Sequence, residues 1–206
     1  MAQAHSTFRA VETIFAKHAR EQAFKEEQMA LIVGSLLGDG HLMRSTAGFC
    51  FRAHHGVAQI CYVRWKYAFL RSFVRTAPRI SGSGCYFRTI THPALSELAD
   101  DFYSDGKKIV PVRRLERAFT TLSFAVWLMD DGAADGRQTR LNTQCFSHAD
   151  VSGLSGFLRH RFGIHTTINS DKGRPRLRIA NRSMRLLRGL LLPQVLPQFR
   201  YKLGAQ

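Results

Sequence analysis

The chain has 206 residues, of which 45% are hydrophobic. That is enough to fill the core of one ordinary domain or two small ones, and it excludes disorder as the main state. Its 30 Lys and Arg against 15 Asp and Glu leave a formal net charge of +15 at pH 7, which favours a polyanionic partner, either nucleic acid or an acidic membrane surface. No run approaches the roughly 18 apolar residues of a membrane-spanning helix, so we expect a soluble chain and no membrane partner.

Residues 1–27 predict an amphipathic helical extension that packs on the domain after it. Acidic residues such as Glu12 and Glu21 are mixed with the basic ones, which argues against an acid-poor transit peptide. The residues that recur at helical spacing are Phe8, Val11, Ile14, Phe15 and His18.

Two segments then share one pattern, an apolar run of helical length that ends in an acid and a glycine. The first is 30–40, Ala-Leu-Ile-Val-Gly-Ser-Leu-Leu-Gly-Asp-Gly, and the second is 122–132, Leu-Ser-Phe-Ala-Val-Trp-Leu-Met-Asp-Asp-Gly. An offset of 92 residues aligns Asp39 with Asp131 and Gly40 with Gly132. This repetition predicts a diverged duplication.

The segments after each acid follow the same order in both halves, which supports the duplication. We expect a strand, a helix, a hairpin and a second helix. In the first half these are 49–54, 57–74, 79–80 with 85–91, and 93–103. In the second half they are 140–146, 149–162, 166–169 with 176–180, and 183–192. Lys108 and Lys202 follow at 69 and 71 residues beyond their acids, and the stretch between the halves, with Arg113 and Arg114, is interpreted as a basic linker.

An acid at the end of a helix has two interpretations. It can be a solvated side chain beside a C-terminal glycine. However, an acid at the negative end of the helix dipole costs about 0.3 to 1 kcal/mol, and here it occurs twice at equivalent places. A hard divalent cation such as magnesium, bound by Asp39 and Asp131, would remove that cost. Gly34 and Gly38 leave one helix face nearly bare, which suits either close helix approach or ordinary packing.

These residues resemble the LAGLIDADG homing endonucleases. Residues 32–40, Ile-Val-Gly-Ser-Leu-Leu-Gly-Asp-Gly, match the motif of that family, and 127–132, Trp-Leu-Met-Asp-Asp-Gly, resemble its second copy in single-chain members. Further blocks of resemblance are 86–95, 106–111, 141–147 and 201–203. The likeness covers roughly residues 28–203, with Val126 and Asp130 standing where the first motif has Gly34 and Gly38.

The resemblance implies an α+β fold, with an αββαββα unit present twice, at 28–115 and 116–206. It implies paired motif helices at a pseudo-two-fold seam and a DNA-binding β-saddle in a monomer. It also implies hydrolysis of both strands of a long DNA site. Asp39 and Asp131, with the main-chain carbonyls of Gly38 and Asp130, would bind Mg²⁺, and Mn²⁺ or Ca²⁺ can occupy the same sites.

Three further residues carry over from the resemblance to the cleavage centres. Lys108 and Lys202 match the basic residues that flank these centres, where they would activate water or offset charge in the transition state. Gln144 matches a polar position that places the attacking water. Its counterpart in the first half stays open among Arg52, His54 and His55. For the two histidines, a contact in the DNA groove or a place in a turn is favoured over metal ligation.

Base recognition is expected from side chains on the predicted strands and hairpins, because a two-stranded ribbon fits the DNA major groove. The candidates are Arg44, Arg52, His54, Arg79, Arg88, Arg137, Gln138, Arg140, Asn142, Lys172, Arg174, Arg176 and Arg178. For any one of them a phosphate contact or a solvated role is the competing interpretation. Because the halves differ at these positions, we expect an asymmetric target.

Two rival functions stay open at this stage. One is an RNA maturase that assists the splicing of its intron, since a basic surface binds RNA as well as DNA. The other is a DNA-binding module that has lost cleavage, although both acids and both lysines favour an active nuclease. The chain shows no intein-like junction residues, so we expect a free-standing enzyme.

The cysteines bear on the compartment. Cys50, Cys61, Cys85 and Cys145 are scattered and form no Cys-x-x-Cys pair, which favours reduced and mostly buried thiols over a zinc site or a disulfide framework. We therefore expect an intracellular protein, in a bacterial cytoplasm or in an organelle.

Overall fold

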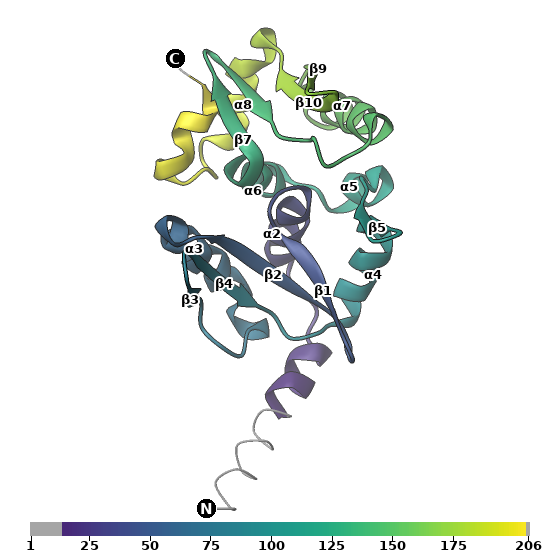
Figure 1. The fold of residues 1–206 in the computed structure, drawn as a ribbon, viewed down its shortest axis with the longest axis vertical. Coiled ribbons are helices and arrows are strands. Elements are labelled where there is room, and N and C mark those ends of the chain that lie inside the picture. Colours follow the sequence, from purple (N-terminus) through teal and green to yellow (C-terminus); the bar gives the residue numbers. More distant parts are fainter. Residues whose placement is uncertain (1–13, 205–206) are drawn as a thin grey trace, which may run out of the picture. The chain divides into compact units, whose positions relative to one another are not determined.

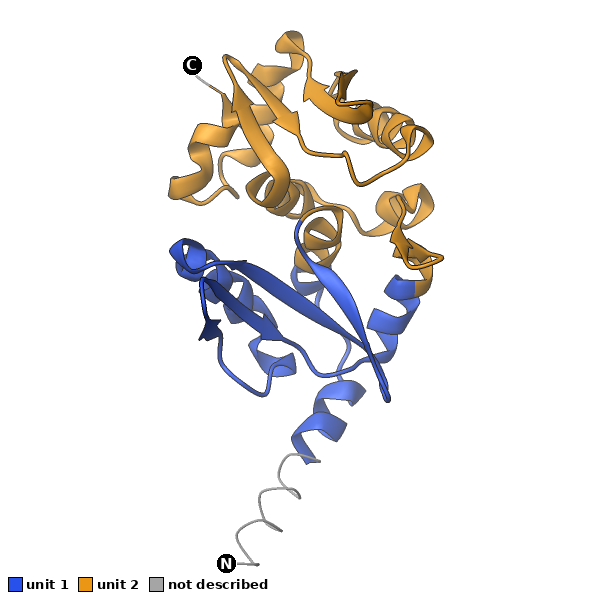
Figure 2. Cartoon of the chain, viewed as in Figure 1, with its two compact units in different colours: residues 1–29, 39–99 blue, residues 30–38, 100–206 orange. Residues whose placement is uncertain are grey.

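The computed structural model describes residues 14–204, and they form two compact units. The first unit holds the described residues up to 29 and Asp39–Ala99, and the second holds Ala30–Gly38 and the described residues from 100 onward (Figure 2). The first motif helix, α2 (Glu26–Leu37), is therefore shared between the units. This division follows spatial contact, whereas the boundaries expected at 28–115 and 116–206 follow the sequence repeat and stay a prediction.

The first unit contains a four-stranded antiparallel sheet, in the order β1-β2-β4-β3. Its strands are β1 (His41–Ser45), β2 (Gly48–Gly56), β3 (Arg79–Ser81) and β4 (Gly84–Arg88). Helix α3 (Ile60–Leu70) packs on β2 and β4, and α4 (Pro93–Phe102) follows the sheet (Figure 1). Short 3-10 turns at Val57–Gln59 and Arg71–Phe73 flank α3.

The second unit repeats this order with a second four-stranded sheet, β7-β8-β10-β9. Its elements are α6 (Thr121–Asp131), β7 (Gly132–Asp135), β8 (Gln138–Leu141), α7 (His148–Phe162), β9 (Thr166–Asp171), β10 (Arg174–Ile179) and α8 (Met184–Leu191). A 3-10 segment, Pro197–Leu203, ends the described chain. Counted from α2, the element order is αββαββα twice, which confirms the expected α+β class.

Local sequence explains where the elements of the second unit begin and end. Helix α6 starts at a capping box, in which the Thr120 side chain accepts from the Ser123 amide. Helix α7 starts at the same kind of box, made by Ser147 and Asp150, and ends at Gly163 with φ of 68°. That left-handed conformation is one that glycine adopts without steric cost.

The end of α2 packs tightly on α6 within the second unit. A Cβ added at Gly34 would lie 2.3 Å from the Ser123 carbonyl oxygen, and one added at Gly38 would lie 2.5 Å from the Asp130 Cβ. Glycine is therefore required at both places by close approach. The partner of Gly34 on α6 is Ser123, so Val126 does not prevent the tight contact.

Strands β1 and β7 follow the motif helices directly and were not located from the residues, although the family resemblance implied two strands there. Three further segments differ from the sequence-based expectation. The strand expected at 140–146 ends at Leu141, and the residues after it turn, because the Thr143 hydroxyl donates to the Pro175 carbonyl (3.0 Å) and accepts from the Leu177 amide (3.2 Å). The expected basic linker is helix α5 (Val112–Ala118), whose Leu115 is fully buried. A hairpin of β5 (Tyr103–Ser104) and β6 (Lys107–Lys108) precedes it and was not anticipated.

The N-terminal segment packs on the first unit through different residues from those expected. Residues 14–21 are helical, but Ile14 is 67% exposed and the buried residue is Ala19. Farther along, the Phe24 ring stacks on Phe73 at 4.0 Å. Phe8 and Val11 lie outside the described residues.

The cysteines are only partly as expected. All four carry free thiols, and Cys50 and Cys85 are buried, whereas Cys61 and Cys145 are exposed. Among the described residues, no helix is both long enough and apolar enough to cross a membrane.

Candidate active site

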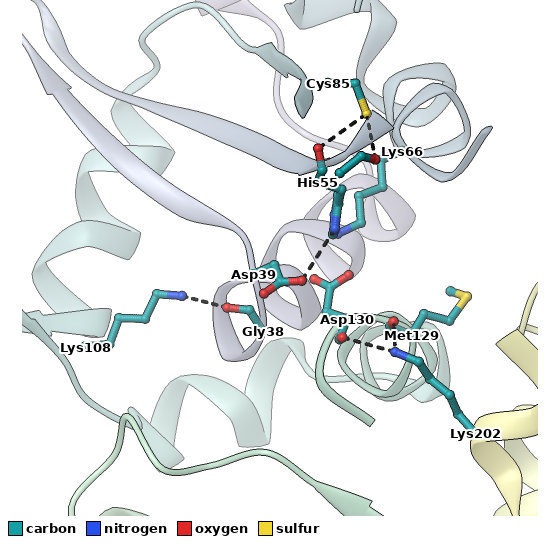
Figure 3. A network of polar contacts seen from close by, with 10 residues as sticks. Gly38, Asp39, His55, Lys66, Cys85, Lys108, Met129, Asp130 and Lys202 are labelled. Atoms are coloured by element: carbon teal, nitrogen blue, oxygen red, sulfur yellow. Dashed lines mark hydrogen bonds and ion pairs between the residues drawn. The ribbon is translucent and has the colours of Figure 1, made fainter. Parts of the chain in front are cut away.

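Two lysines donate to main-chain carbonyls at the ends of the two motif helices, both within the second unit. Lys108 Nζ lies 2.8 Å from the Gly38 carbonyl oxygen. Lys202 Nζ lies 3.1 Å from the Asp130 carbonyl oxygen and 2.5 Å from that of Met129 (Figure 3). Since Gly38 and Asp130 are equivalent under the 92-residue offset, the two contacts are counterparts.

These contacts follow from helix electrostatics. The last carbonyls of a helix have no intrahelical donor and carry its partial negative charge, so a cation is stabilising there. Strand β6 places Lys108, and the 3-10 segment places Lys202, whose own carbonyl accepts from the buried Thr139 hydroxyl at 2.7 Å. Lys202 is buried, with 7% of its surface exposed. The carbonyls of Gly38 and Asp130 are therefore oriented to bind positive charge.

The two predicted metal-binding acids follow these carbonyls directly in the chain. Asp39 comes immediately after Gly38, and 48% of its side chain is exposed. Asp131 is the last residue of α6, and its main-chain carbonyl accepts from the Asn142 amide at 3.0 Å. Carboxylate and carbonyl oxygens are the ligands that hard divalent cations prefer. Each helix end thus offers a donor set that fits magnesium.

The Asp131 end also contains an exposed thiol, at Cys145. Although the residue as a whole is exposed, partial burial of its sulfur raises the pKa of Cys145. The Lys108 charge lowers that pKa and the Asp131 charge raises it. Lys108 and Asp131 therefore both act on the loop that follows β8, which also carries Gln144.

Gln144 makes its hydrogen bond at the β9–β10 hairpin. Its amide donates to Asp171 Oδ2 at 3.0 Å, and the Arg176 guanidinium pairs with the same carboxylate. The Gln144 hydrogen bond, followed by the nearby Arg176 and Lys172 charges, lowers the pKa of Asp171. This partner was not foreseen, and the assignment of Gln144 to water placement stays a prediction.

Sequence reasoning missed a buried lysine in the first unit. Lys66 on α3 is fully buried, and its Nζ lies 3.4 Å from Nε2 of His55. The Nδ1 atom of His55 in turn lies 3.5 Å from Oδ2 of Asp39 (Figure 3). The signal was present, because Lys66 stands four residues after Tyr62 and four before Leu70, on the apolar stripe of the helix.

The sheet of the first unit forms a basic hollow of about 580 Å³. The arginines that line it are Arg20, Arg44, Arg52, Arg75, Arg79 and Arg88. Arg52 and Arg88 are directly opposed on β2 and β4, and the Arg52 guanidinium lies 4.7 Å from the centre of the Tyr86 ring. Like charges opposed on a sheet repel each other unless an anion lies between them.

Two of these arginines were not among the candidates, and one candidate lies outside the hollow. Arg20 is held by Thr91, to whose carbonyl and hydroxyl it donates at 3.1 and 2.9 Å. Arg75 also lines the hollow. His54 is exposed on β2, with its ring against Tyr86. Only the packed tertiary structure brings Arg20 and Arg75 to this sheet.

The candidates of the second unit differ in how much of their charge is compensated. Arg140 is opposed to Arg178 across β8 and β10, and Arg178 forms an ion pair with Asp135. The Gln138 amide donates to the Ile179 carbonyl at 2.9 Å. The other candidates lie in the turns or on β10: Arg137, Asn142, Lys172 and Arg174. Part of the basic face expected here is thus neutralised by acids of the same sheet.

Sequence comparison connects the chain with a known family and with longer proteins. The profile of the "LAGLIDADG DNA endonuclease family" matches residues 29–187. The cytochrome b mRNA maturase bI2 of Saccharomyces cerevisiae is 26% identical over 200 residues, covering 85% of this chain and 47% of the relative. A protein RecA of Mycolicibacterium flavescens is 30% identical over 198 residues, covering 86% of this chain and 46% of the relative. The chain therefore spans about half the length of these relatives.

Solved structures share the fold. The homing endonuclease I-WcaI, bound to its DNA recognition sequence, superposes with a TM-score of 0.84 at 22% identity, covering 92% of each chain. I-DmoI in complex with DNA and Mn superposes with a TM-score of 0.56 at 14% identity, covering 83% of this chain and 99% of that one. At these identities the likeness establishes the architecture alone.

Proposed function

Because the chain belongs to the LAGLIDADG DNA endonuclease family, we propose that it is a site-specific homing endonuclease. It hydrolyses both strands of double-stranded DNA at a long asymmetric target, and it acts as an intracellular monomer. The observation that carries this proposal is the pair of equivalent contacts in which Lys108 and Lys202 reach the carbonyls of Gly38 and Asp130. Both lysines also neutralise the negative ends of the motif helices, and their equivalent placement at the two acids is what favours a cleavage role.

The cleavage centres are assigned to the ends of the motif helices. Asp39 with the Gly38 carbonyl, and Asp131 with the Asp130 carbonyl, hold divalent metal, with Mg²⁺ as the proposed ion and Mn²⁺ or Ca²⁺ as ions that fit the same oxygen ligands. When bound, the metal polarises the scissile phosphate and stabilises charge on the attacking and leaving oxygens. The ammonium groups of Lys108 and Lys202 offset the negative charge that develops on the phosphate.

DNA binding is assigned to the two sheets. The arginine-lined hollow of the first unit supplies positive charge for phosphates, and its opposed pair, Arg52 and Arg88, is relieved of repulsion when an anion binds. In the second unit, Arg176 and Arg178 form ion pairs with Asp171 and Asp135, and these pairs must break before either arginine can bind DNA. Arg140 and Arg174 are proposed to contact DNA without such an exchange. Base recognition is therefore proposed to be unequal in the two halves.

A second candidate function is that of an RNA maturase. It is favoured by one observation, the similarity to a relative named as a cytochrome b mRNA maturase. The formal charge of +15 is compatible with RNA as well as DNA.

The deciding experiment is cleavage of a randomised duplex library by purified protein. The reactions contain magnesium, EDTA, or magnesium with the Asp39→Asn variant. Enrichment of one long asymmetric site that depends on metal and is lost in the variant is the expected result. Retention of a specific duplex without any cleavage would refute the endonuclease in favour of a binding module. Preference for structured RNA over every duplex would favour the maturase.

A further inference from the structure

A lysine, Lys66, lies in the core of the first unit, at a position where an apolar side chain would be expected. Lys66 has no exposed surface, and it projects from α3 between the buried Tyr62 and Leu70. Burying an ammonium group carries a desolvation cost that a hydrophobic side chain avoids. The position in the second half that matches Lys66 at the 92-residue offset is Leu158, which is also fully buried. The architecture therefore does not require the charge.

The lysine is held against a histidine whose ring is itself fixed. The Lys66 Nζ lies 4.6 Å from the centre of the Tyr62 ring and 3.4 Å from Nε2 of His55. The His55 ring lies against Tyr62 at 5.1 Å, and its main-chain carbonyl accepts from the Cys85 thiol at 3.6 Å. The side chain of His55 is only 3% exposed. This packing presents Nε2 to Lys66 and Nδ1 to Asp39.

The direction of the hydrogen bonds follows from the groups involved. An ammonium has three hydrogens and no lone pair, so it can only donate to Nε2 of His55. A neutral imidazole whose Nε2 accepts carries its hydrogen on Nδ1. That hydrogen faces Oδ2 of Asp39, 3.5 Å from Nδ1. With its Nε2 lone pair turned toward Lys66, a neutral His55 directs an N–H, and not a lone pair, toward Asp39.

We propose that Lys66 and His55 are positioning residues for Asp39, connected by the hydrogen bond from Lys66 to His55 and by the 3.5 Å contact of His55 Nδ1 with Asp39 Oδ2. The matching positions of the second half hold Ser147, which caps α7, and Leu158. The two cleavage centres are therefore built differently, and the Asp39 centre alone depends on Lys66. This inference rests on the proposed function, because it assigns Lys66 and His55 to one of the two proposed cleavage centres.

The first test reads the tautomer of His55 and needs no activity. The full chain is labelled with nitrogen-15 in its histidines, and the His55 signals are assigned by their loss in His55→Gln. We expect the wild-type ring to carry its hydrogen on Nδ1 and the Lys66→Met variant to lose this preference. The matched control is Arg64→Met, which removes an exposed positive charge from the same helix and should leave the tautomer unchanged. A wild-type ring protonated on Nε2, or a tautomer unaltered in Lys66→Met, would overturn the proposal.

The second test measures each DNA strand separately on the target recovered from the library. In Lys66→Met, we expect cutting of one strand to fall by about ten- to a hundred-fold, the usual effect of removing a group that orients a metal ligand. Cutting of the other strand should stay within about twofold of wild type, and Arg64→Met should cut both strands normally. An equal loss on both strands, or none, would overturn the proposal. A wild-type protein that cuts no DNA would instead refute the endonuclease. The tautomer measurement would still show whether Lys66 sets the tautomer of His55.

Discussion

Replacing Gly34 by alanine should destabilise the protein, because the added methyl group meets backbone. The new Cβ would lie 2.3 Å from the Ser123 carbonyl oxygen and 2.8 Å from its Cα, whereas ordinary contacts begin at 3.4 Å. The helices would have to move apart by about 1 Å, and overpacking of this kind costs about 1 to 3 kcal/mol. For a chain of this length, about 2 kcal/mol lowers Tm by about 4 to 8 °C.

A matched substitution separates this contact from the general effect of removing a glycine. Gly156 lies in the middle of α7, and nothing lies within 4 Å of a Cβ added there. Alanine at Gly156 should stabilise the protein by about 0.5 to 1 kcal/mol through helix propensity alone. Thermal and urea unfolding, followed by circular dichroism, would compare the two variants. Equal stability of Gly34→Ala and Gly156→Ala would refute the close packing of α2 on α6.

Three further predictions concern Lys202, Gln144 and the exposed cysteines. Lys202→Met should cost about 1 to 3 kcal/mol in urea unfolding, because the carbonyls at the end of α6 lose a buried donor; unchanged stability would contradict that contact. Gln144→Leu should raise the pKa of Asp171, measured by carboxyl NMR. Because the pKa of Asp171 is lowered in the folded protein, its carboxylate stabilises the fold above the usual pKa. That stabilisation is lost as the pH falls through the folded pKa. The free energy of unfolding of Gln144→Leu should therefore fall less over this pH range. Thiol reagents should modify the exposed Cys61 and Cys145 and leave the buried Cys50 and Cys85 unmodified. Cys145 should react slowly at neutral pH and faster as the pH rises, because its pKa is raised. Fast reaction of Cys145 at neutral pH would contradict the raised pKa.

The parts of the fold that were predictable from sequence are those set by local pattern. The 92-residue repeat located both motif helices, and apolar spacing located the later helices and most of the strands, but not β1 or β7. The repeat spacing paired Lys108 with Lys202, but their contacts with the carbonyls of Gly38 and Asp130 were not anticipated, and their catalytic roles stay predictions. The strand expected to run to 146 failed because a side chain, Thr143, satisfies backbone groups of β10 and ends the ladder.

The parts that were not predictable depend on long-range contacts. Arg20 and Arg75 line the basic hollow of the first unit, but they come from segments whose sequence does not predict a strand. The ion pairs of Arg176 and Arg178 depend on which acids the sheet register brings near them. The Lys66 contact with His55 required the packing of α3 on β2, although a lysine in an apolar helical stripe was visible in the sequence.

The central claim, that the chain cuts DNA at two acid-dependent centres, is tested most directly by separating binding from cutting on one substrate. Asp39→Asn and Asp131→Asn keep the size of each side chain and remove its charge. On the target from the library, in magnesium, both variants should bind the duplex about as tightly as wild type. Neither variant should produce a double-strand break. Full double-strand cutting by either variant would contradict the assignment of these carboxylates to the metal, and with it the proposed mechanism.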